Sequence, residues 1–496
     1  MLFNSYIFIF LFLPAALFGY FGLNHFGWYR TAKLFLVGMS LWFYAYYRLS
    51  YLWIILSSIA VNYVLHRLLL RYRGKRWLLT LGVAGNIGLL FYFKYFTFLC
   101  SALGQVTHTD FSLPEIVMPL GISFFTFQQI GFLVDTYRGE VERQNVVDYA
   151  LFVTFFPQLI AGPIVNQSEM LPQFQDPAKK KPDGPDFYEG LRLFILGLGK
   201  KVLLADVIGQ AADWGFTYYT LLDGMNTWLV MLLYTLQLYF DFSGYCDMAR
   251  GIGRMFRIEL PVNFYSPYKS RNIREFWDRW HMSLTRFFTR YVYIPLGGSR
   301  KGRVRTYINV FLVFVLSGIW HGAGLTYLTW GALHGAMSVL TRLWQELKSK
   351  MGFHGFHNRV LRKTANILSV FLTFAFVTLA LTFFRADSVG QALAMVRTAF
   401  SFTGSGVYLE LAGYFQVPEL WYPMKVLQIS GAAGAEYFCF ALYMIAALWI
   451  VFALPNVKQS EETHRPWFLY SATLSMIAVW SVLSLSGVST FLYFNF

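Results

Sequence analysis

Apolar segments separated by short polar loops repeat along the whole chain. Many contain roughly 17 to 25 residues, enough for a helix to cross a hydrocarbon core of about 30 Å. We expect spanning helices near residues 2–22, 34–49, 51–70, 78–101, 115–136, 190–208, 226–249, 365–384, 435–454 and 468–488. The pattern therefore predicts an all-α fold, a polytopic membrane helical bundle of about 10–12 spans plus re-entrant helices. Because no linker or repeat divides the chain, residues 1–496 are expected to form one membrane domain.

Two apolar regions do not fit a single crossing. The segment from Val147 to Pro163 lies between two basic loops, so we expect it to enter and leave the membrane on one side. The region from Tyr307 to Leu340 also begins and ends at basic loops, which requires two short crossings or two broken helices that meet near Trp320 to Gly324. Irregular backbone at that depth is tolerated only where it is buried in protein or lines a water-filled cavity.

Basic residues concentrate in the loops beside the apolar segments. The loops at 29–33, 67–76, 138–143, 179–181, 269–305 and 342–363 are basic, whereas 101–115 and 209–227 contain no Lys or Arg. Since basic loops remain in the cytosol, both termini are expected on the extracytoplasmic side, and residues 387–428 are expected to form an extracytoplasmic insertion. This bias accounts for most of the net charge of +15 in a chain that is 56% hydrophobic, so no nucleic-acid partner is expected.

His321 is the first candidate for chemistry. It lies in the apolar run Ser317 to Gly324, and an ionisable residue at bilayer depth is a functional-site hypothesis by default. A buried imidazole favours its neutral form, which can remove a proton from a hydroxyl that attacks an acyl group. We therefore predict that His321 is a catalytic base.

Two further histidines are candidates. His281 lies in a segment from Asn272 to Tyr291 with helical spacing and a basic polar side, and it falls on or beside the apolar face. Two readings of His281 stay open: a functional imidazole, and a histidine that only hydrogen-bonds within the packing. His334 lies thirteen residues after His321, roughly 220° around a continuous helix, so the two share a face only if the helix breaks between them. A structural role is favoured for His334.

Other classes of chemistry are disfavoured. The chain has no His-Glu-x-x-His helix, and its three cysteines (Cys100, Cys246 and Cys439) lie far apart, so no metal site is expected. It also lacks the Gly-x-Ser-x-Gly elbow of serine hydrolases and a phosphate-binding P-loop.

Four sequence blocks resemble one family. The blocks are Trp320 to Gly322, Arg274 to Leu284, Phe155 to Pro163, and Gln237 to Met248. Through these four blocks, which follow one another along the chain in the same order as in the family, the chain resembles the membrane-bound O-acyltransferase (MBOAT) family. The resemblance is to its alginate O-acetylase (AlgI) branch in particular.

The resemblance implies a helical bundle around a tunnel or funnel, with His321 matching the catalytic histidine and His281 a second functional histidine. It also implies no bound cofactor, with acetyl-CoA as the cytosolic acetyl donor. The expected acceptor is an extracytoplasmic polysaccharide of the alginate type, reached through an extracytoplasmic hydrolase-like (SGNH-type) acetyltransferase as partner, in a bacterial inner membrane. The terminal aromatic motif at 491–496 resembles one in which a tyrosine carries the acyl group, which makes Tyr493 the acyl-relay candidate; an interfacial aromatic residue is the alternative.

Further residues are assigned by their position. Polar residues within apolar helices usually face the bundle interior, so the tunnel-lining candidates are Trp320, Gln158, Asp241, Ser243, Tyr245, Asp247 and His334. The basic cluster of Arg300, Lys301, Arg303 and Arg305 is the candidate site for the donor phosphates, with simple membrane anchoring as the alternative. Two other functions stay open: the same chemistry on peptidoglycan or another cell-wall glycan, and a transporter of a lipid-linked or acylated molecule.

Overall fold

Most of the residues that the structure describes lie in helices. The computed structural model describes residues 1–108, 116–352, 357–415, 424–426, 428, 434–463, 468–486 and 491–492. Within these ranges the only strand-like pairing is an isolated antiparallel bridge between Phe264 and Trp280. The all-α prediction is confirmed for the described residues.

The chain divides into two compact units. The first contains residues 1–197 and 245–262, and the second contains residues 198–244 and 263–492. The boundaries fall inside two helices, α10 (Gly184–Gly199) and α12 (Gly224–Met255), rather than in a linker. A single membrane domain therefore stays a prediction.

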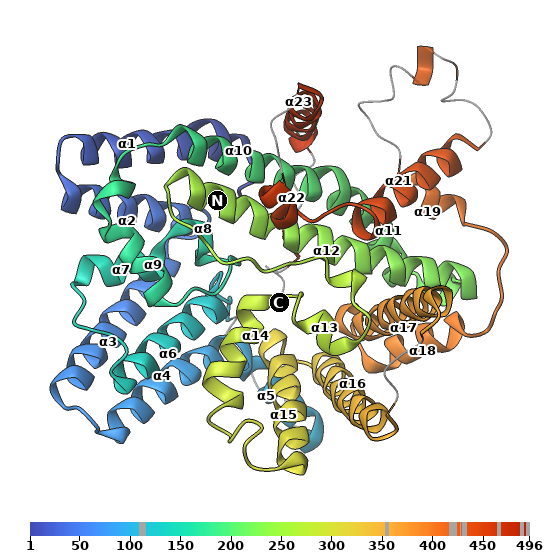
Figure 1. The fold of residues 1–496 in the computed structure, drawn as a ribbon, viewed down its shortest axis with the longest axis horizontal. Helices are drawn as coiled ribbons and strands as arrows, with labels where there is room; N and C mark the ends of the chain where they lie inside the picture. The colour runs from blue at the N-terminus through green and yellow to red at the C-terminus, as the bar shows by residue number, and fades with distance from the viewer. Residues whose placement is uncertain are drawn as a thin grey trace. The chain divides into compact units, whose positions relative to one another are not determined.

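The first unit is a set of helices around an aromatic core. Its elements are η1 (Phe8–Phe12), α1 (Leu13–His25), α2 (Tyr29–Ala45), α3 (Tyr51–Arg71), α4 (Arg76–Lys94), α5 (Phe96–Thr107), α6 (Ile122–Arg138), α7 (Val146–Thr154), α8 (Phe156–Leu159), α9 (Gln167–Gln175), η2 (Pro177–Lys180), most of α10 and the end of α12. Helices α1 and α2 pack side by side (Figure 1). The rings of Phe8, Phe12, Phe43 and Phe156 meet at centroid distances of 5.2–6.1 Å.

The region from Val147 to Pro163 folds as two short helices rather than one span. Helix α7 ends before Phe155, and α8, which carries Pro157 in its first turn, has only four residues. Neither helix approaches the roughly 20 residues that a crossing requires. This geometry is consistent with the predicted re-entrant segment.

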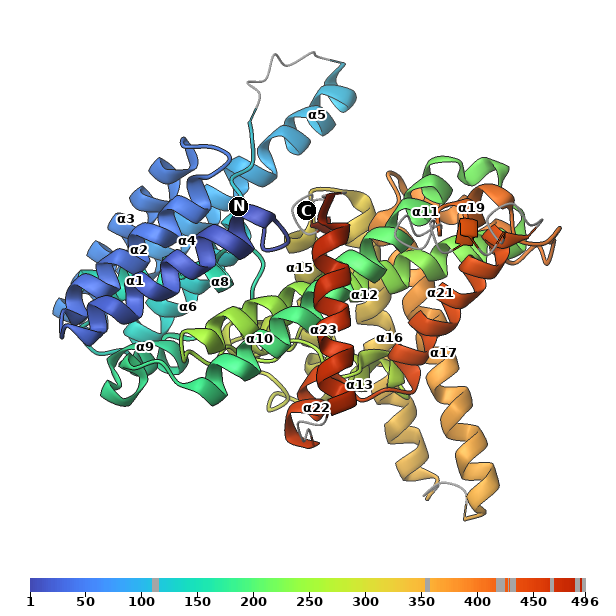
Figure 2. The ribbon, with the colours of Figure 1, turned by 90° about the horizontal axis from the view of Figure 1, so that it is seen from above.

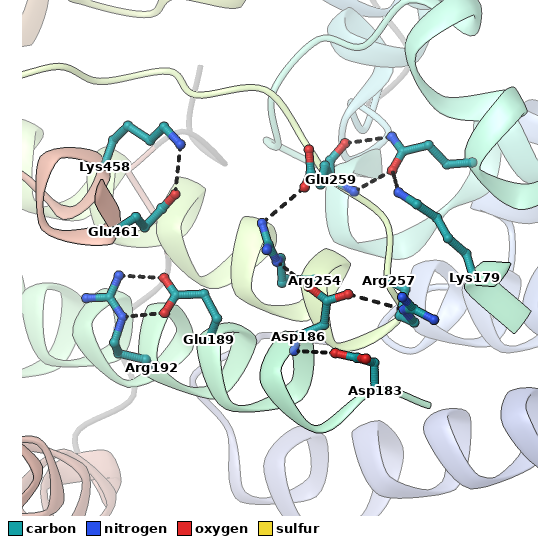
Figure 3. A network of polar contacts seen from close by, with 11 residues as sticks. Lys179, Asp183, Asp186, Glu189, Arg192, Arg254, Arg257, Glu259, Lys458 and Glu461 are labelled. Atoms are coloured by element: carbon teal, nitrogen blue, oxygen red, sulfur yellow. Dashed lines mark hydrogen bonds and ion pairs between the residues drawn. The ribbon is translucent and has the colours of Figure 1, made fainter. Parts of the chain in front are cut away.

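In the first unit, helices α10 and α12 cross at two glycines and are joined by ion pairs. A Cβ atom on Gly190 would lie 2.6 Å from the carbonyl oxygen of Gly251, so neither position has room for a side chain. Asp186 accepts from Arg254 at 2.8 Å and from Arg257 at 3.1 Å (Figure 3). These bonds satisfy charged groups at the helix ends and fix the crossing.

The second unit contains the candidate histidines. Its elements are the last residues of α10, η3 (Lys200–Ala205), α11 (Asp206–Thr217), η4 (Tyr219–Leu221), the first part of α12, η5 (Pro267–Lys269), α13 (Ile273–Trp277), α14 (Met282–Phe288), η6 (Thr289–Tyr293), α15 (Arg303–His321), α16 (Leu325–Lys350), α17 (Arg359–Arg385), α18 (Val389–Ala399), α19 (Leu409–Gly413), α21 (Ala435–Phe452), α22 (Val457–Thr463), α23 (Phe468–Leu483) and η7 (Ser484–Ser486). Helices α15 and α16 pack together, and α16 and α17 run side by side in both views (Figures 1 and 2). Helices α18 and α19 lie within the expected insertion at 387–428.

Six described helical segments are long and apolar enough to cross a membrane: Phe8–His25, Tyr51–Arg71, Arg76–Lys94, Arg303–His321, Arg359–Arg385 and Ala435–Phe452. Two further expected spans, α2 and α6, are helices of 17 residues each. The expected 78–101 span is divided at Tyr95 between α4 and α5. The count of about 10–12 crossings stays a prediction.

Candidate active site

His321 is the last residue of α15, where a helical hairpin turns. Gly322 and Gly324 have extended backbones, and α16 starts at Leu325. The two helices approach closely at glycines: a Cβ atom on Gly331 would lie 2.5 Å from the carbonyl oxygen of Phe314. The predicted break near Trp320 to Gly324 is confirmed, and it places His321 at the turn.

Aromatic rings from three helices surround His321. Its side chain is buried, and its ring centroid lies 4.7 Å from that of Trp320, 5.1 Å from that of Trp330 and 5.1 Å from that of Phe384 on α17. The His321 imidazole is therefore held in an aromatic enclosure at the hairpin turn.

His334 lies close to His321 because the helix breaks between them. Helix α16 returns alongside α15, and Trp330 packs between the two histidines, with its ring 4.9 Å from that of His334. The indole N–H of Trp277 donates to Nδ1 of His334 at 3.2 Å. An Nδ1 that accepts this bond leaves the proton of the neutral ring on Nε2.

The prediction of one helix from Asn272 to Tyr291 is wrong. Helix α13 ends at Trp277, and His281 has a left-handed backbone with φ of 45° before α14 begins. The backbone here pairs with the segment after α12: the amides of Met282 and Ser283 donate to the backbone and side-chain oxygens of Asn263 at 3.1 and 3.0 Å. These hydrogen bonds to Asn263 replace the bonds that a continuous helix would form, so the helix is interrupted at His281. A non-glycine residue at positive φ is uncommon.

His281 points inward, as expected. It is 1% exposed, and its ring lies 4.8 Å from that of Phe242 on α12 and 6.4 Å from that of Trp320. Burial lowers the pKa of His281 to about 3. The rings thus form a series in the order His281, Trp320, His321, Trp330, His334. The three imidazoles do not converge on one point, and no group of three His, Cys, Asp or Glu suited to a metal ion occurs among the residues that the structure describes.

A cavity of about 240 Å³ begins beside this series. It is lined by Arg274, Trp277, Asp278, Leu284, Thr285, Phe288, Thr289, Tyr293, Val310, Val313, Phe314, Ser317, Ser338 and Arg342. Trp277 is common to the cavity wall and the His334 hydrogen bond. Ser317 lies one turn before His321, and Ser338 one turn after His334. The Ser338 hydroxyl, 5% exposed as a residue, has no hydrogen-bond partner among the described residues.

A second cavity of about 470 Å³ shares Arg274 and Arg342 with the first. Arg303 lines it and lies 3.8 Å from Glu346. Arg300, Lys301 and Arg305 are exposed and line neither cavity. Of the four predicted phosphate-binding residues, the structure therefore brings only Arg303 to these cavities.

Sequence reasoning missed Arg274 and Arg342. A signal for Arg342 was present, because His334, Ser338 and Arg342 follow one another at intervals of four and so share one face of α16. Arg274 begins the block that contains His281, but only the broken α13 geometry places it on the same cavity as Arg342.

The other tunnel-lining candidates have different surroundings. In the first unit, the Gln158 amide donates to the carbonyl oxygen of Phe152 at 2.7 Å, Tyr245 stacks on Phe3 at 4.8 Å, and Asp247 lies 3.9 Å from Arg250. In the second unit, Asp241 pairs with Lys201, and Ser243 is buried. Their lining of a tunnel stays a prediction. Tyr493 lies outside the described residues, whereas Phe491 and Leu492 are described.

The fold and site define a multi-pass helical membrane protein with a buried histidine at a helical hairpin turn. The model of the membrane-bound O-acyltransferase family matches residues 25–384, which include all three histidines, and the chain belongs to this family.

Named relatives agree with this assignment. The chain is 37% identical to the peptidoglycan O-acetyltransferase of Helicobacter pylori, over 100% of this chain and 98% of the relative. It is 38% identical to the probable alginate O-acetylase AlgI of Pseudomonas aeruginosa, over 81% of this chain and 75% of the relative. A teichoic acid D-alanyltransferase of Bacillus subtilis is 27% identical over 53% of this chain and 67% of its own length.

The protein is therefore an enzyme of the acyltransferase class. The predictions of the family and of a membrane-bound acyltransferase are confirmed. The comparisons give no support to the alternative of a transporter without covalent chemistry.

Proposed function

We propose that this protein transfers an acetyl group from acetyl-CoA in the cytosol across a bacterial inner membrane, for O-acetylation of an extracytoplasmic polysaccharide. The observation that carries the proposal is His321, buried at the turn between α15 and α16 and linked through Trp330 and His334 to the wall of an arginine-lined cavity. The O-acetyltransferase relatives support an acetyl group as the cargo.

In the proposed reaction, His321 acts as general base. A hydroxyl oxygen attacks the thioester carbonyl while its proton moves to the imidazole; the C–S bond then breaks, and the coenzyme A thiolate takes the proton back. The hydroxyl belongs to Tyr493 or to a serine of the partner. An enclosure of aromatic rings excludes the water that would otherwise hydrolyse the thioester.

The donor would enter at the two arginines. Neither Arg274 nor Arg342 forms an ion pair with a described residue, so both guanidinium groups are available to phosphate oxygens, for which Arg geometry is well suited. The narrow cavity from these arginines to Trp277 would hold the pantetheine arm, and the Ser338 hydroxyl offers it a hydrogen bond.

The other two histidines have supporting roles in this proposal. The Trp277 hydrogen bond fixes the ring of His334, and Trp330 transmits its position to His321. His281 packs on Trp320 from the opposite side of the series and would assist His321 near the acceptor.

The acceptor is proposed to be a polysaccharide outside the membrane, reached through an SGNH-type acetyltransferase, with both termini of this chain on that side. The sequence resemblance favours alginate, with peptidoglycan as the second candidate. The two kinds of relative are 38% and 37% identical, so the acceptor is decided by assaying both glycans.

The test uses the full chain in sealed vesicles with [14C]acetyl-CoA on the side of the basic loops. We expect label on the protein or on a glycan acceptor in the presence of the partner, and at least about 10²-fold slower labelling with His321→Ala. Label transfer at the wild-type rate by a folded His321→Ala protein would remove His321 from its role. Transport of an acylated molecule without cleavage of the thioester would instead support the transporter.

A further inference from the structure

The second unit contains a buried cluster of three charged side chains. Lys201 Nζ lies 2.7 Å from an oxygen of Asp206 and 2.7 Å from an oxygen of Asp241. The side chains of Lys201 and Asp241 are each 2% exposed. Buried charges are costly unless their lone pairs and protons are used, so a buried ammonium–carboxylate pair favours a further hydrogen-bond donor at the carboxylate.

That further donor comes from the C-terminal segment. The backbone N–H of Leu492 donates to the second oxygen of Asp241 at 3.2 Å. The ammonium of Lys201 lies 4.8 Å from the centroid of the Phe491 ring, within the range of a cation–π interaction. Phe491 is fully buried. The two members of the ion pair therefore contact two successive residues near the end of the chain, Lys201 with Phe491 and Asp241 with Leu492.

Asp241, the member of the cluster that belongs to α12, lies on the turn of this helix that also contacts the histidine series. Asp241 binds the C-terminal segment, and the next residue, Phe242, packs on His281 at 4.8 Å. Leu492 is followed directly in the chain by Tyr493, the candidate acyl carrier. One turn of α12 thus connects the segment that precedes this tyrosine with His281.

From these contacts we propose that Lys201 and Asp241 are positioning residues: they anchor the C-terminal segment at Phe491 and Leu492, and this anchoring is required for delivery of the acetyl group through Tyr493, the next residue in the chain. The proposal rests on the proposed acetyl transfer through Tyr493. A cluster that served stability alone would have no separate effect on the hand-off of the acetyl group.

Two variants of Leu492 test the anchoring of the C-terminal segment without changing Lys201 or Asp241. Leu492→Pro removes the N–H that Asp241 accepts, and Leu492→Ala keeps it. Carboxypeptidase release of terminal residues, followed by intact mass, reports how firmly the segment is held. We expect release about tenfold faster for Leu492→Pro than for Leu492→Ala, the effect of losing one hydrogen bond to a charged group.

Asp241→Asn and Lys201→Met test the cluster itself, with Lys33→Met as the matched control. Lys33 forms an ion pair of 2.6 Å with Asp148 in the first unit, and Phe491 and Leu492, the described residues of the terminal motif, are not among its hydrogen-bond or ion-pair partners. We expect acetyl delivery to the acceptor to fall about tenfold in both cluster variants, with the KM for acetyl-CoA within about twofold of wild type. Lys33→Met should leave delivery per folded molecule unchanged.

The outcomes distinguish the proposed anchoring of the C-terminal segment, here called the seat, from the proposed acetyl transfer. If Leu492→Pro resists carboxypeptidase as well as Leu492→Ala does, or if the cluster variants deliver acetyl groups at the wild-type rate, the seat is refuted while acetyl transfer stands. If wild-type protein never cleaves acetyl-CoA, the proposed function fails, and the carboxypeptidase comparison still decides whether the segment is seated. A rise in the KM for acetyl-CoA that matches the loss of delivery would show a general structural role and overturn the proposal.

Discussion

His66 in the first unit and His321 in the second are both buried histidines in helical segments that could span a membrane, yet their surroundings differ. Nδ1 of His66 lies 2.9 Å from Oγ1 of Thr136, which joins α3 to α6, and its ring packs on Phe132 at 4.8 Å. His321 sits at a helix end among three aromatic rings, in a series that reaches a cavity. Burial alone therefore does not separate the catalytic role proposed for His321 from the structural role expected of His66; the difference between them is the aromatic series that joins His321 to the cavity wall.

Removal of each imidazole tests this comparison most strongly. His321→Ala should lower kcat by about 10²- to 10⁴-fold, the usual contribution of a general base, while the protein stays folded. His66→Ala should lower the melting temperature, because it removes the Thr136 interaction and leaves a cavity, but it should keep kcat per folded molecule. Steady-state acetyl-CoA cleavage and thermal unfolding in detergent measure both quantities. Equal losses of kcat in the two variants would mean that the surroundings do not decide the role.

The arginines at the cavity give the next largest effect. Arg274→Gln and Arg342→Gln should each raise the KM for acetyl-CoA about 10- to 100-fold with a smaller change in kcat, since each removes a charge-assisted hydrogen bond to phosphate. Arg300→Gln and Arg305→Gln, which change exposed residues away from both cavities, should alter KM by less than about twofold. If Arg300→Gln and Arg305→Gln raised the KM for acetyl-CoA more than Arg274→Gln and Arg342→Gln, the donor phosphates would bind at the basic loop that the sequence suggested.

Trp277→Phe sharpens the role of His334. The substitution keeps an aromatic ring against Trp330 and Phe314 but removes the N–H that Nδ1 of His334 accepts. We expect kcat to fall about 3- to 10-fold, the value of one neutral hydrogen bond, with little change in KM. A double-mutant cycle with His334→Gln shows whether the effect on kcat acts through His334. If it does, the double variant Trp277→Phe/His334→Gln should lose no more kcat than His334→Gln alone.

Local sequence patterns predicted much of the fold because each pattern expresses a local requirement. Apolar length predicted the helices, and the basic loops at both ends of the region from Tyr307 to Leu340 predicted the break near Trp320 to Gly324. The break at His281 could not be predicted from its own segment, because it depends on hydrogen bonds to Asn263, on another part of the chain. The same limit applies to Arg274 and Arg342, which share a cavity only through the packing of α13 against α16.

The smallest expected effect concerns another buried histidine, His281, and the dependence of stability on pH. Its pKa of about 3 in the folded protein lies below the ordinary value near 6.5, so between these pH values the unfolded chain binds a proton that the folded chain does not. The stabilisation is complete above about pH 6.5 and is lost as the pH falls, by about 1.4 kcal/mol for each pH unit within that window. Melting temperatures from pH 7.5 to 5 should therefore fall less steeply for His281→Gln than for wild type. An unchanged slope would mean that His281 takes up a proton in the folded state, and would place it with the histidines that can exchange protons during the reaction rather than with those that only pack.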